Sequence, residues 1–425
     1  MLTVGILIII LLLLVGSPIF MSMAAGASFL ALAYMGVPLN TIPQVMFASI
    51  DSFSLLSIPF FLLCGILMTA GGPSRHLVDF FDSLVGHFPG GLGIVTVLSC
   101  MFFASISGSS PATAIAVGSV MVPSMVELGY DKRFSMGLAC ASGTLGILIP
   151  PSIPMIMYAS ITELSIPRVF LAGFLPGVVL GGILITTAVV ISVRKKYGGH
   201  VRKTWAERWK AFKTALPALG MPILILGGIY GGIFTPTEAA AVSCIYAYLI
   251  SRFIYRELNR EKLLKALKET AQASAMIFLI ICAAILLGRV LTFAQIPQKF
   301  AGLVTGVKLN PYLFLLGVNI IYLIMGCLIE TVTIIYVTVP IFYPVLGLLG
   351  IDPIHFAIIL IVNIELALIT PPVGINIYVM SGACKEPFER VVSGVIPFII
   401  TMTIGLFIIT YWPGVSLLLD KIFYR

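Results

Sequence analysis

Stretches of about 20 consecutive apolar residues recur along the whole chain, and each is long enough to cross the hydrocarbon layer of a bilayer as an α-helix. Examples are Leu2–Met35, Phe53–Ala70, Phe170–Val193, Met276–Ile296 and Val391–Tyr411. The runs show none of the alternation that is typical of membrane β-strands. Only 10% of the 425 residues are charged, whereas soluble domains have about 25%. The sequence therefore predicts an all-α polytopic membrane protein.

The basic residues are unevenly distributed. None precedes Arg75, whereas eight fall within Arg194–Lys213 and six within Arg252–Lys268. The positive-inside rule places both clusters in the cytoplasm and the turn near Phe234 outside. The net charge of +8 is thus explained by membrane topology, and no nucleic-acid partner is expected.

The chain between these two basic clusters is predicted to contain a pair of short spans, residues 216–231 and 239–250. The preceding segment Thr204–Lys213 places tryptophans among basic residues, which indicates an interfacial amphipathic helix. The tetrad Thr235-Pro236-Thr237-Glu238 has the order of a capping box that opens the second span.

An internal repeat at an offset of 221 residues relates the two halves of the chain. The matching landmarks are Pro123 with Pro344, Leu128-Gly129-Tyr130-Asp131 with Leu349-Gly350-Ile351-Asp352, Pro150-Pro151 with Pro371-Pro372, and Gly173 and Pro176 with Gly394 and Pro397. The basic clusters predict that Phe53–Ala70 enters the cytoplasm and that its counterpart Met276–Ile296 leaves it. Inverted repeats of this kind are typical of secondary transporters.

Each repeat contains two interrupted apolar stretches, at residues 105–111 and 143–151 in the first copy and 326–331 and 365–372 in the second. Proline has no N–H, so the two proline pairs are expected to free carbonyls at Gly146, Ile147, Ala367 and Leu368. Such oxygens, together with the hydroxyls of Ser105, Ser107 and Ser109, are ligands that small cations prefer. The alternative is an ordinary proline kink that a neighbouring helix stabilises.

The half-helices that start near Ser110 and Thr331 are expected to point their positive ends inward, which suits a carboxylate. Glu330 and Glu365 lie at the breaks, either as functional acids at membrane depth or at loop edges in water. Arg289, late in a span, is interpreted as snorkelling or pairing with a lipid headgroup.

Catalytic and metal motifs are missing from the sequence. The seven cysteines stand singly in apolar spans and read as small buried hydrophobes, and the four histidines form no HExxH motif. A membrane-embedded enzyme and a passive channel are therefore disfavoured, and a structural scaffold would have no use for two matched breaks.

Five stretches of the sequence resemble the large membrane subunit, DctM type, of tripartite ATP-independent periplasmic (TRAP) transporters. They occur in family order and are Asp51-Ser52-Phe53, Phe102-Phe103-Ala104-Ser105-Ile106-Ser107-Gly108-Ser109, Ile149-Pro150-Pro151-Ser152-Ile153-Pro154, Phe234-Thr235-Pro236-Thr237-Glu238-Ala239-Ala240-Ala241 and Ile369-Thr370-Pro371-Pro372-Val373-Gly374. The resemblance implies an inverted-repeat, elevator-type ion-transporter fold with about 11 transmembrane helices and two re-entrant hairpins.

The resulting domain prediction has four parts. Residues 1–51 form N-terminal scaffold helices, with 2–35 as one long kinked helix or two. Residues 52–193 form the first repeat, with a hairpin near 92–126. Residues 194–271 form the cytoplasmic amphipathic helix and a connecting helical pair, and residues 272–425 form the second repeat, with a hairpin near 312–348.

The resemblance also implies a multi-pass protein of the bacterial inner membrane that takes up an organic anion by sodium symport. C4-dicarboxylates are the favoured substrates, and sialic acid or another sugar acid is the alternative. A periplasmic solute-binding protein delivers the anion. A small four-helix membrane subunit, DctQ type, is expected as a separate chain because the first span begins at residue 2.

At least two sodium sites are expected where the hairpin tips meet the broken helices. The residues carried over are Ser105, Ser107, Gly146 and Ile149 for one site, and Gly326, Ala367 and Thr370 for the other. Substrate contacts are expected at Ser109, Ser110, Pro111, Pro151, Glu330, Thr331 and Pro372. The pair Glu330-Thr331 departs from the Asp-Pro of many relatives, which leaves the role of that acid open.

Overall fold

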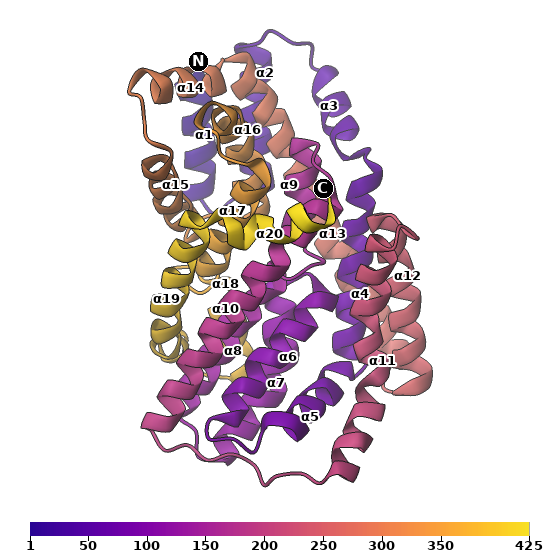
Figure 1. Cartoon of the computed structure of the whole chain (residues 1–425). Coiled ribbons are helices and arrows are strands. Elements are labelled where there is room, and N and C mark those ends of the chain that lie inside the picture. The colour runs from indigo at the N-terminus through magenta and orange to yellow at the C-terminus, as the bar shows by residue number, and fades with distance from the viewer. Residues whose placement is uncertain (425) are drawn as a thin grey trace.

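The computed structural model describes residues 1–424, and the described residues form helices and connecting loops without any strand (Figure 1). Six segments among them are long and apolar enough to cross a membrane. The all-α prediction is confirmed.

The N-terminal stretch forms two separate helices, α1 (Leu2–Leu14) and α2 (Ile19–Ala33), followed by α3 (Thr41–Ile50). The break falls at Gly16, whose positive φ of 86° suits glycine, and Pro18 follows it. Gly5 packs against Leu30, and Gly26 packs against Ile9, so the two helices are antiparallel. The alternative of one long kinked helix is therefore wrong.

The helices after α3 form two runs in the same order, joined by a central pair. The first run contains α4 (Ser57–Ala70), preceded by a 3₁₀ turn at Phe53–Leu56, α5 (Pro73–Val85), α6 (Gly91–Ser107), α7 (Ser110–Glu127), α8 (Lys132–Thr144), a 3₁₀ turn at Leu145–Ile147, α9 (Ile153–Thr162) and α10 (Ile166–Arg194). The central pair is α11 (Trp205–Tyr230) and α12 (Pro236–Leu249), with a π-helical turn at Ile250–Ile254. The second run contains α13 (Arg260–Phe293), α14 (Ile296–Gly306), α15 (Pro311–Gly326), α16 (Thr331–Leu349), α17 (Pro353–Ala367), α18 (Ile375–Cys384) and α19 (Phe388–Tyr411), and α20 (Pro413–Phe423) ends the chain.

The repeat landmarks occupy equivalent places in the two runs. Pro123 and Pro344 lie inside α7 and α16, and the side chains of Asp131 and Asp352 cap the N-termini of α8 and α17. The hairpin α6–α7 lies in the lower half of Figure 1 and α15–α16 in the upper half. The two copies are therefore inverted relative to one another, as the basic clusters predict.

The two repeats interlock. Helix α8 packs against α7 of its own repeat and against α19 of the other, and α18 packs against α7. At the crossing of α8 and α19, Gly137 and Gly394 bring the backbones so close that a Cβ on either residue would overlap a carbonyl of the facing helix. Together the repeats form a single packed body around the two hairpins.

The amphipathic segment 204–213 forms the first turns of α11 and does not form a separate helix. The expected division from the span at 216–231 is wrong, because no glycine or other stop signal separates Lys213 from Leu216. The side chain of Thr204 caps this long helix, and hydrogen bonds from Thr204 to the Glu207 carboxylate hold the pKa of that carboxyl below its ordinary value. The capping box of Thr235 and Glu238 that opens α12 is confirmed.

Cysteines placed at two exposed loop positions test the orientation of the chain. Val201 is 90% exposed within the first basic cluster, and Ile233 is 70% exposed in the turn between α11 and α12. We expect Val201→Cys to react with an impermeant maleimide only after the cells are permeabilised, and Ile233→Cys to react in intact cells. The chain without an added cysteine gives the background, and labelling of Val201→Cys in intact cells would contradict the orientation.

Candidate functional site

The two hairpins end in short turns that expose helix N-termini. In the first hairpin, α6 ends at Ser107, Gly108 adopts a positive φ of 59°, and α7 begins at Ser110. In the second, α16 begins at Thr331, and the carboxylate of Glu330 accepts a hydrogen bond from the Val332 N–H at 3.0 Å. Both half-helices start where the sequence indicates.

A cavity of about 180 Å³, here called the central cavity, lies between the two tips. Five of the expected substrate residues line it, namely Ser109, Ser110 and Pro111 from the first tip and Glu330 and Thr331 from the second. Leu62 of α4 and Ile277 of α13 also contribute to its wall. The two helix N-termini therefore open into one shared space.

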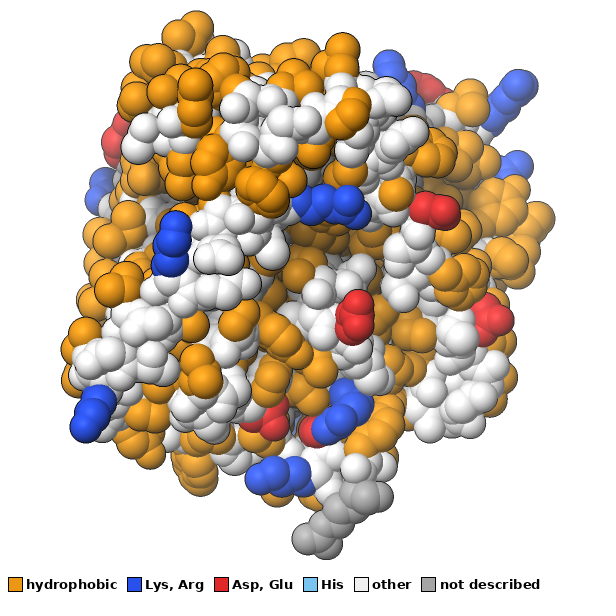
Figure 2. Space-filling model, turned by 90° about the horizontal axis from the view of Figure 1, so that it is seen from above, with side chains coloured by type: hydrophobic (Ala, Val, Ile, Leu, Met, Phe, Trp, Pro, Cys, Tyr) orange, Lys and Arg blue, Asp and Glu red, His pale blue; other side chains and the backbone are white. Residues whose placement is uncertain are grey.

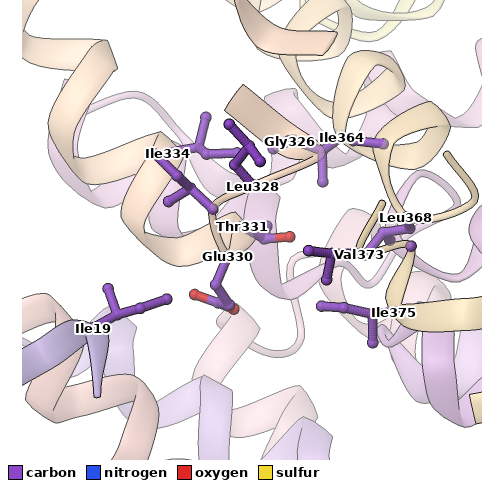
Figure 3. Close-up of a pocket in the computed structure, with 13 residues that line it drawn as sticks. Ile19, Gly326, Leu328, Glu330, Thr331, Ile334, Ile364, Leu368, Val373 and Ile375 are labelled. Carbon is purple, nitrogen blue, oxygen red and sulfur yellow. The ribbon is translucent and has the colours of Figure 1, made fainter. Parts of the chain in front are cut away.

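A second, smaller space of about 120 Å³, here called the side cavity, surrounds the tip of the second hairpin. Figure 3 shows Thr331 projecting toward Val373 and the carboxylate of Glu330 lying between Ile19 and Ile375. Glu330 and Thr331 line both cavities. A single acid is thus shared by the two spaces.

The remaining two expected substrate residues lie elsewhere. Pro151 is buried, and its carbonyl faces Gly108, where a Cβ would approach the oxygen to 2.9 Å. Pro372 is exposed, and neither proline lines the central cavity or the side cavity. Pro151 therefore packs beside the first tip.

Hydroxyl and carbonyl oxygens gather behind the first tip. The Ser107 and Thr113 hydroxyls are 2.8 Å apart, and the Thr113 hydroxyl donates to the Ser109 carbonyl at 2.8 Å. Gly146 lies directly against this group, because a Cβ there would be 2.6 Å from the Ser109 carbonyl oxygen and 2.7 Å from the Thr113 Oγ1. Sequence reasoning missed Thr113, although a hydroxyl one turn into the half-helix is a recognisable signal.

Ser105 and Ile149 occupy different positions from this group of oxygens. The Ser105 hydroxyl donates to the Phe102 carbonyl of its own helix at 2.6 Å. The Ile149 N–H donates to the Leu145 carbonyl at 3.0 Å, and the side chain of Ile149 faces Gly177. Of the four residues expected at the first sodium site, the structure brings Ser107 and Gly146 together.

Around the second tip, Gly326 lies in contact with Ala367, and both line the side cavity. The Thr370 hydroxyl donates to the Leu366 carbonyl at 2.6 Å, and Thr370 does not line that cavity. Of the three residues expected at the second sodium site, the structure therefore brings Gly326 and Ala367 together.

Three of the four carbonyls that the prolines were expected to free have hydrogen-bond partners. The Ile147 carbonyl accepts from the Ser152 hydroxyl at 2.5 Å, and the Ala367 and Leu368 carbonyls accept from the N–H groups of Thr370 and Asn376, both at 3.1 Å. The expectation of free carbonyls is wrong for these three. Ser152 and Asn376, which follow the proline pairs, donate to Ile147 and Leu368, and Thr370, which directly precedes the second pair, donates to Ala367. A carbonyl has two lone pairs, so each can still accept one more interaction.

Asn376, which sequence reasoning also missed, ties the two repeats together at the first tip. This fully buried residue donates to the Ser110 Oγ at 2.8 Å and to the Cys140 carbonyl at 3.2 Å. An amide in an apolar segment four residues after Pro372 was the available signal. Asn376 thus positions the N-terminus of α7 from the other repeat.

Glu365 is fully buried within α17, and neither carboxyl oxygen has a hydrogen-bond partner among residues 1–424. It lines neither the central cavity nor the side cavity. The interpretation of Glu365 as a loop-edge residue in water is therefore wrong, whereas Glu330 does stand at a tip.

An all-helical inverted repeat whose hairpin tips share a cavity defines a secondary membrane transporter. Residues 6–415 match the family model described as "Tripartite ATP-independent periplasmic transporter, DctM component". The chain belongs to this TRAP transporter family. It is a multi-pass membrane protein and not an enzyme.

Three relatives show the range of names within the family. The C4-dicarboxylate TRAP transporter large permease protein DctM of Pseudomonas aeruginosa is 46% identical, with 88% of each chain covered. The protein of the same description from Rhodobacter capsulatus is 38% identical over 98% of each chain. The sialic acid TRAP transporter large permease protein SiaM of Vibrio cholerae is 35% identical, over 95% of this chain and 96% of that one.

Two solved structures share the fold at low sequence identity. The crystal structure of the Alcanivorax borkumensis YdaH transporter has a TM-score of 0.62 at 14% identity, over 88% of this chain and 89% of that one. The structure of Neisseria gonorrhoeae MtrF has a TM-score of 0.63 at 15% identity, over 90% of this chain and 85% of that one. These likenesses extend the fold class beyond the family.

Proposed function

We propose that this chain is the large permease of a sodium-driven system that takes up a C4-dicarboxylate-type anion delivered by a periplasmic binding protein. The observation that carries the proposal is the central cavity, which receives the N-termini of α7 and α16 together. Relatives at 46% and 38% identity are named as C4-dicarboxylate permeases, which supports the substrate class.

The geometry of the central cavity suits an anion with a carboxylate at each end. Each helix N-terminus supplies N–H groups and partial positive charge, although the Val332 N–H at the second tip already donates to the Glu330 carboxylate. Ser110 and Thr331 add hydroxyl donors, one from each tip. A dicarboxylate engages both ends at once, whereas a sialic acid, with a single carboxylate, engages one. Sialic acid remains the second candidate because a relative at 35% identity is named for it.

The oxygens of Ser107, Ser109 and Thr113 beside Gly146 are the favoured sodium ligands at the first tip. They carry no formal charge, which suits a monovalent ion that must bind and leave in each cycle. The region of Gly326, Ala367 and Thr370 is proposed for a second sodium ion. Sodium bound behind the tips would fix the half-helices whose N-termini bind the anion, and this linkage would couple the two solutes.

TRAP large permeases work with a small membrane subunit and a periplasmic binding protein, and we propose both as partners of this chain, the small subunit as a separate polypeptide. A relative from Oleidesulfovibrio alaskensis is named as the isethionate permease protein DctMQ. This chain aligns with 64% of the length of that relative at 38% identity. In our proposal, the repeats move together as an elevator past the scaffold helices.

Removing single hydroxyls tests the sodium assignment. We expect Ser107→Ala and Thr113→Val each to lower the apparent sodium affinity about tenfold, because each deletes an oxygen ligand or its hydrogen-bond partner. The measurement is initial uptake of radiolabelled succinate against sodium concentration, in proteoliposomes that contain the complete system.

Thr186→Val is the matched control, since the Thr186 hydroxyl also donates to the carbonyl four residues earlier, but on the exposed face of α10. Its sodium curve should remain that of the parent. Unchanged curves for both site variants would contradict the ion assignment, and succinate that equilibrates without accumulating would indicate a channel.

A further inference from the structure

One face of α13 lines three cavities in succession. Near its start, Lys262, Lys265, Ala266 and Glu269 line an inner cavity of about 490 Å³ that is shared with α4 and α7. Ile277 lines the central cavity. Farther along, Ala284, Ile285, Gly288, Arg289 and Thr292 line an outer cavity of about 510 Å³. These positions are separated by three, four, seven or eight residues, which keeps them on one side of the helix, so the cavities follow a common path.

The outer cavity lies between α3 and α13 on one side and α9 and α16 on the other. Figure 2 shows that the upper face of the molecule is hollowed near its centre, with charged side chains around the hollow. The polar lining consists of one cation and five hydroxyls, from Arg289, Ser49, Ser52, Ser160, Thr292 and Tyr336. This lining is that of an anion site.

Tyr336 supplies an independent sign of a missing partner. Its side chain is 3% exposed and lines the outer cavity, and its hydroxyl has no hydrogen-bond partner among the described residues. A buried hydroxyl without a partner costs free energy that a bound acceptor would recover. Tyr336 stands five residues after Thr331 on α16, so one helix reaches both the outer and the central cavity.

Arg289 differs from the cations of the inner cavity in its pairing. Lys265 lies 3.9 Å from Glu269, and the Lys262 ammonium donates to the carbonyls of Ala70 and Glu257. Within residues 1–424, Arg289 forms no salt bridge and no side-chain hydrogen bond. It lies on the cavity-lining face of α13, which favours binding of a solute over the lipid contact expected from sequence.

We propose that the outer cavity is a receiving site for the substrate, in which Arg289 binds a carboxylate of the arriving anion and Tyr336 donates its hydroxyl to it. This inference rests on the proposed function. Arg289 is twelve residues beyond Ile277, about 18 Å along the axis of α13, so the anion meets it before the hairpin tips. A guanidinium suits this role because it binds a carboxylate through two parallel N–H donors.

Cysteine protection tests the site directly on the purified complex. Ser160→Cys places a thiol on the wall of the outer cavity, and the probe is succinate added before a small anionic thiosulfonate reagent. We expect succinate to slow the modification of this thiol. In the Arg289→Gln variant, half-maximal protection should require a succinate concentration about tenfold higher or more. Tyr336→Phe should weaken it by a smaller factor, and Arg289→Lys should restore part of it.

Sodium-driven succinate uptake by the same variants separates the receiving site from the proposed function. Arg289→Gln should raise the apparent KM for succinate about tenfold and leave the sodium dependence unchanged, while Lys308→Gln, an exposed cation outside the cavity, should change neither. Normal uptake by the parent with equal protection in parent and Arg289→Gln would overturn the receiving site and leave the proposed function standing. Failure of the parent to take up succinate would overturn both. Loss of the small subunit from the Arg289→Gln complex, without a change in KM, would assign Arg289 to an interface.

Discussion

Gly146→Ala is expected to cause a severe loss of sodium-dependent uptake while folded protein still accumulates in the membrane. The added Cβ would lie 2.6 Å from the Ser109 carbonyl oxygen and 2.7 Å from the Thr113 Oγ1, closer than such atoms can approach. The first hairpin tip must therefore move, and it carries both the proposed sodium oxygens and one wall of the central cavity. Small displacements of positioned groups have large effects, so we expect uptake to fall on the order of a hundredfold.

Gly347→Ala is the matched control for this change. Gly347 lies on α16, and a Cβ there meets no atom within 4 Å, so uptake should remain near that of the parent. Uptake against sodium concentration, normalised to folded protein by fluorescence-detected size-exclusion chromatography, gives the comparison. An unchanged sodium curve for Gly146→Ala would show that the oxygens behind the first tip hold no ion.

Asn376→Asp is expected to destabilise the folded protein by about 3–5 kcal/mol, because it places an unpaired acid in the core. The change keeps the shape of the side chain and removes its two donors. The Cys140 carbonyl and the Ser110 hydroxyl would then face a carboxylate, and the carbonyl cannot donate to it. Thermal unfolding in detergent should show a lower melting temperature, and uptake by the protein that folds should be impaired.

The isosteric change Asn310→Asp provides the comparison. Asn310 is exposed and caps α15 by accepting a hydrogen bond from the Tyr312 N–H at 2.8 Å, a role that aspartate fills equally well. Its melting temperature should match that of the parent. Equal melting temperatures for the two variants would show that the contacts of Asn376 contribute little to stability.

Much of the architecture could be predicted from local sequence signals. Proline and glycine mark where helices stop and start, so the beginnings of α7 at Ser110 and α16 at Thr331 follow from the residues around them. The internal repeat can be detected because Pro150-Pro151 and Pro371-Pro372 are separated by the same number of residues as the pairs of landmarks that flank them. Where no proline or glycine separates two segments, as between Lys213 and Leu216, the predicted helix boundary is wrong.

The details of the site depend on contacts between distant segments, and these could not be predicted. Asn376 meets Ser110 from 266 positions away, and Tyr336 matters only because α16 folds beside α13. The expectation of free carbonyls was wrong at Ile147 and Leu368 because the donors, Ser152 and Asn376, lie in segments that return to the break. A proline shows which carbonyl loses its usual donor, and the tertiary fold decides what replaces that donor.

The close crossing of α8 and α19 at Gly137 and Gly394 has a consequence for biogenesis. Helix α8 leaves the ribosome about 250 residues before its partner, which at about 5–20 residues per second corresponds to roughly 13–50 s. During this interval the face of α8 that carries Gly137 lacks the helix against which it packs in the folded protein. The nascent first repeat must therefore wait in the bilayer, or be shielded by the insertion machinery, until translation of the second repeat is nearly complete.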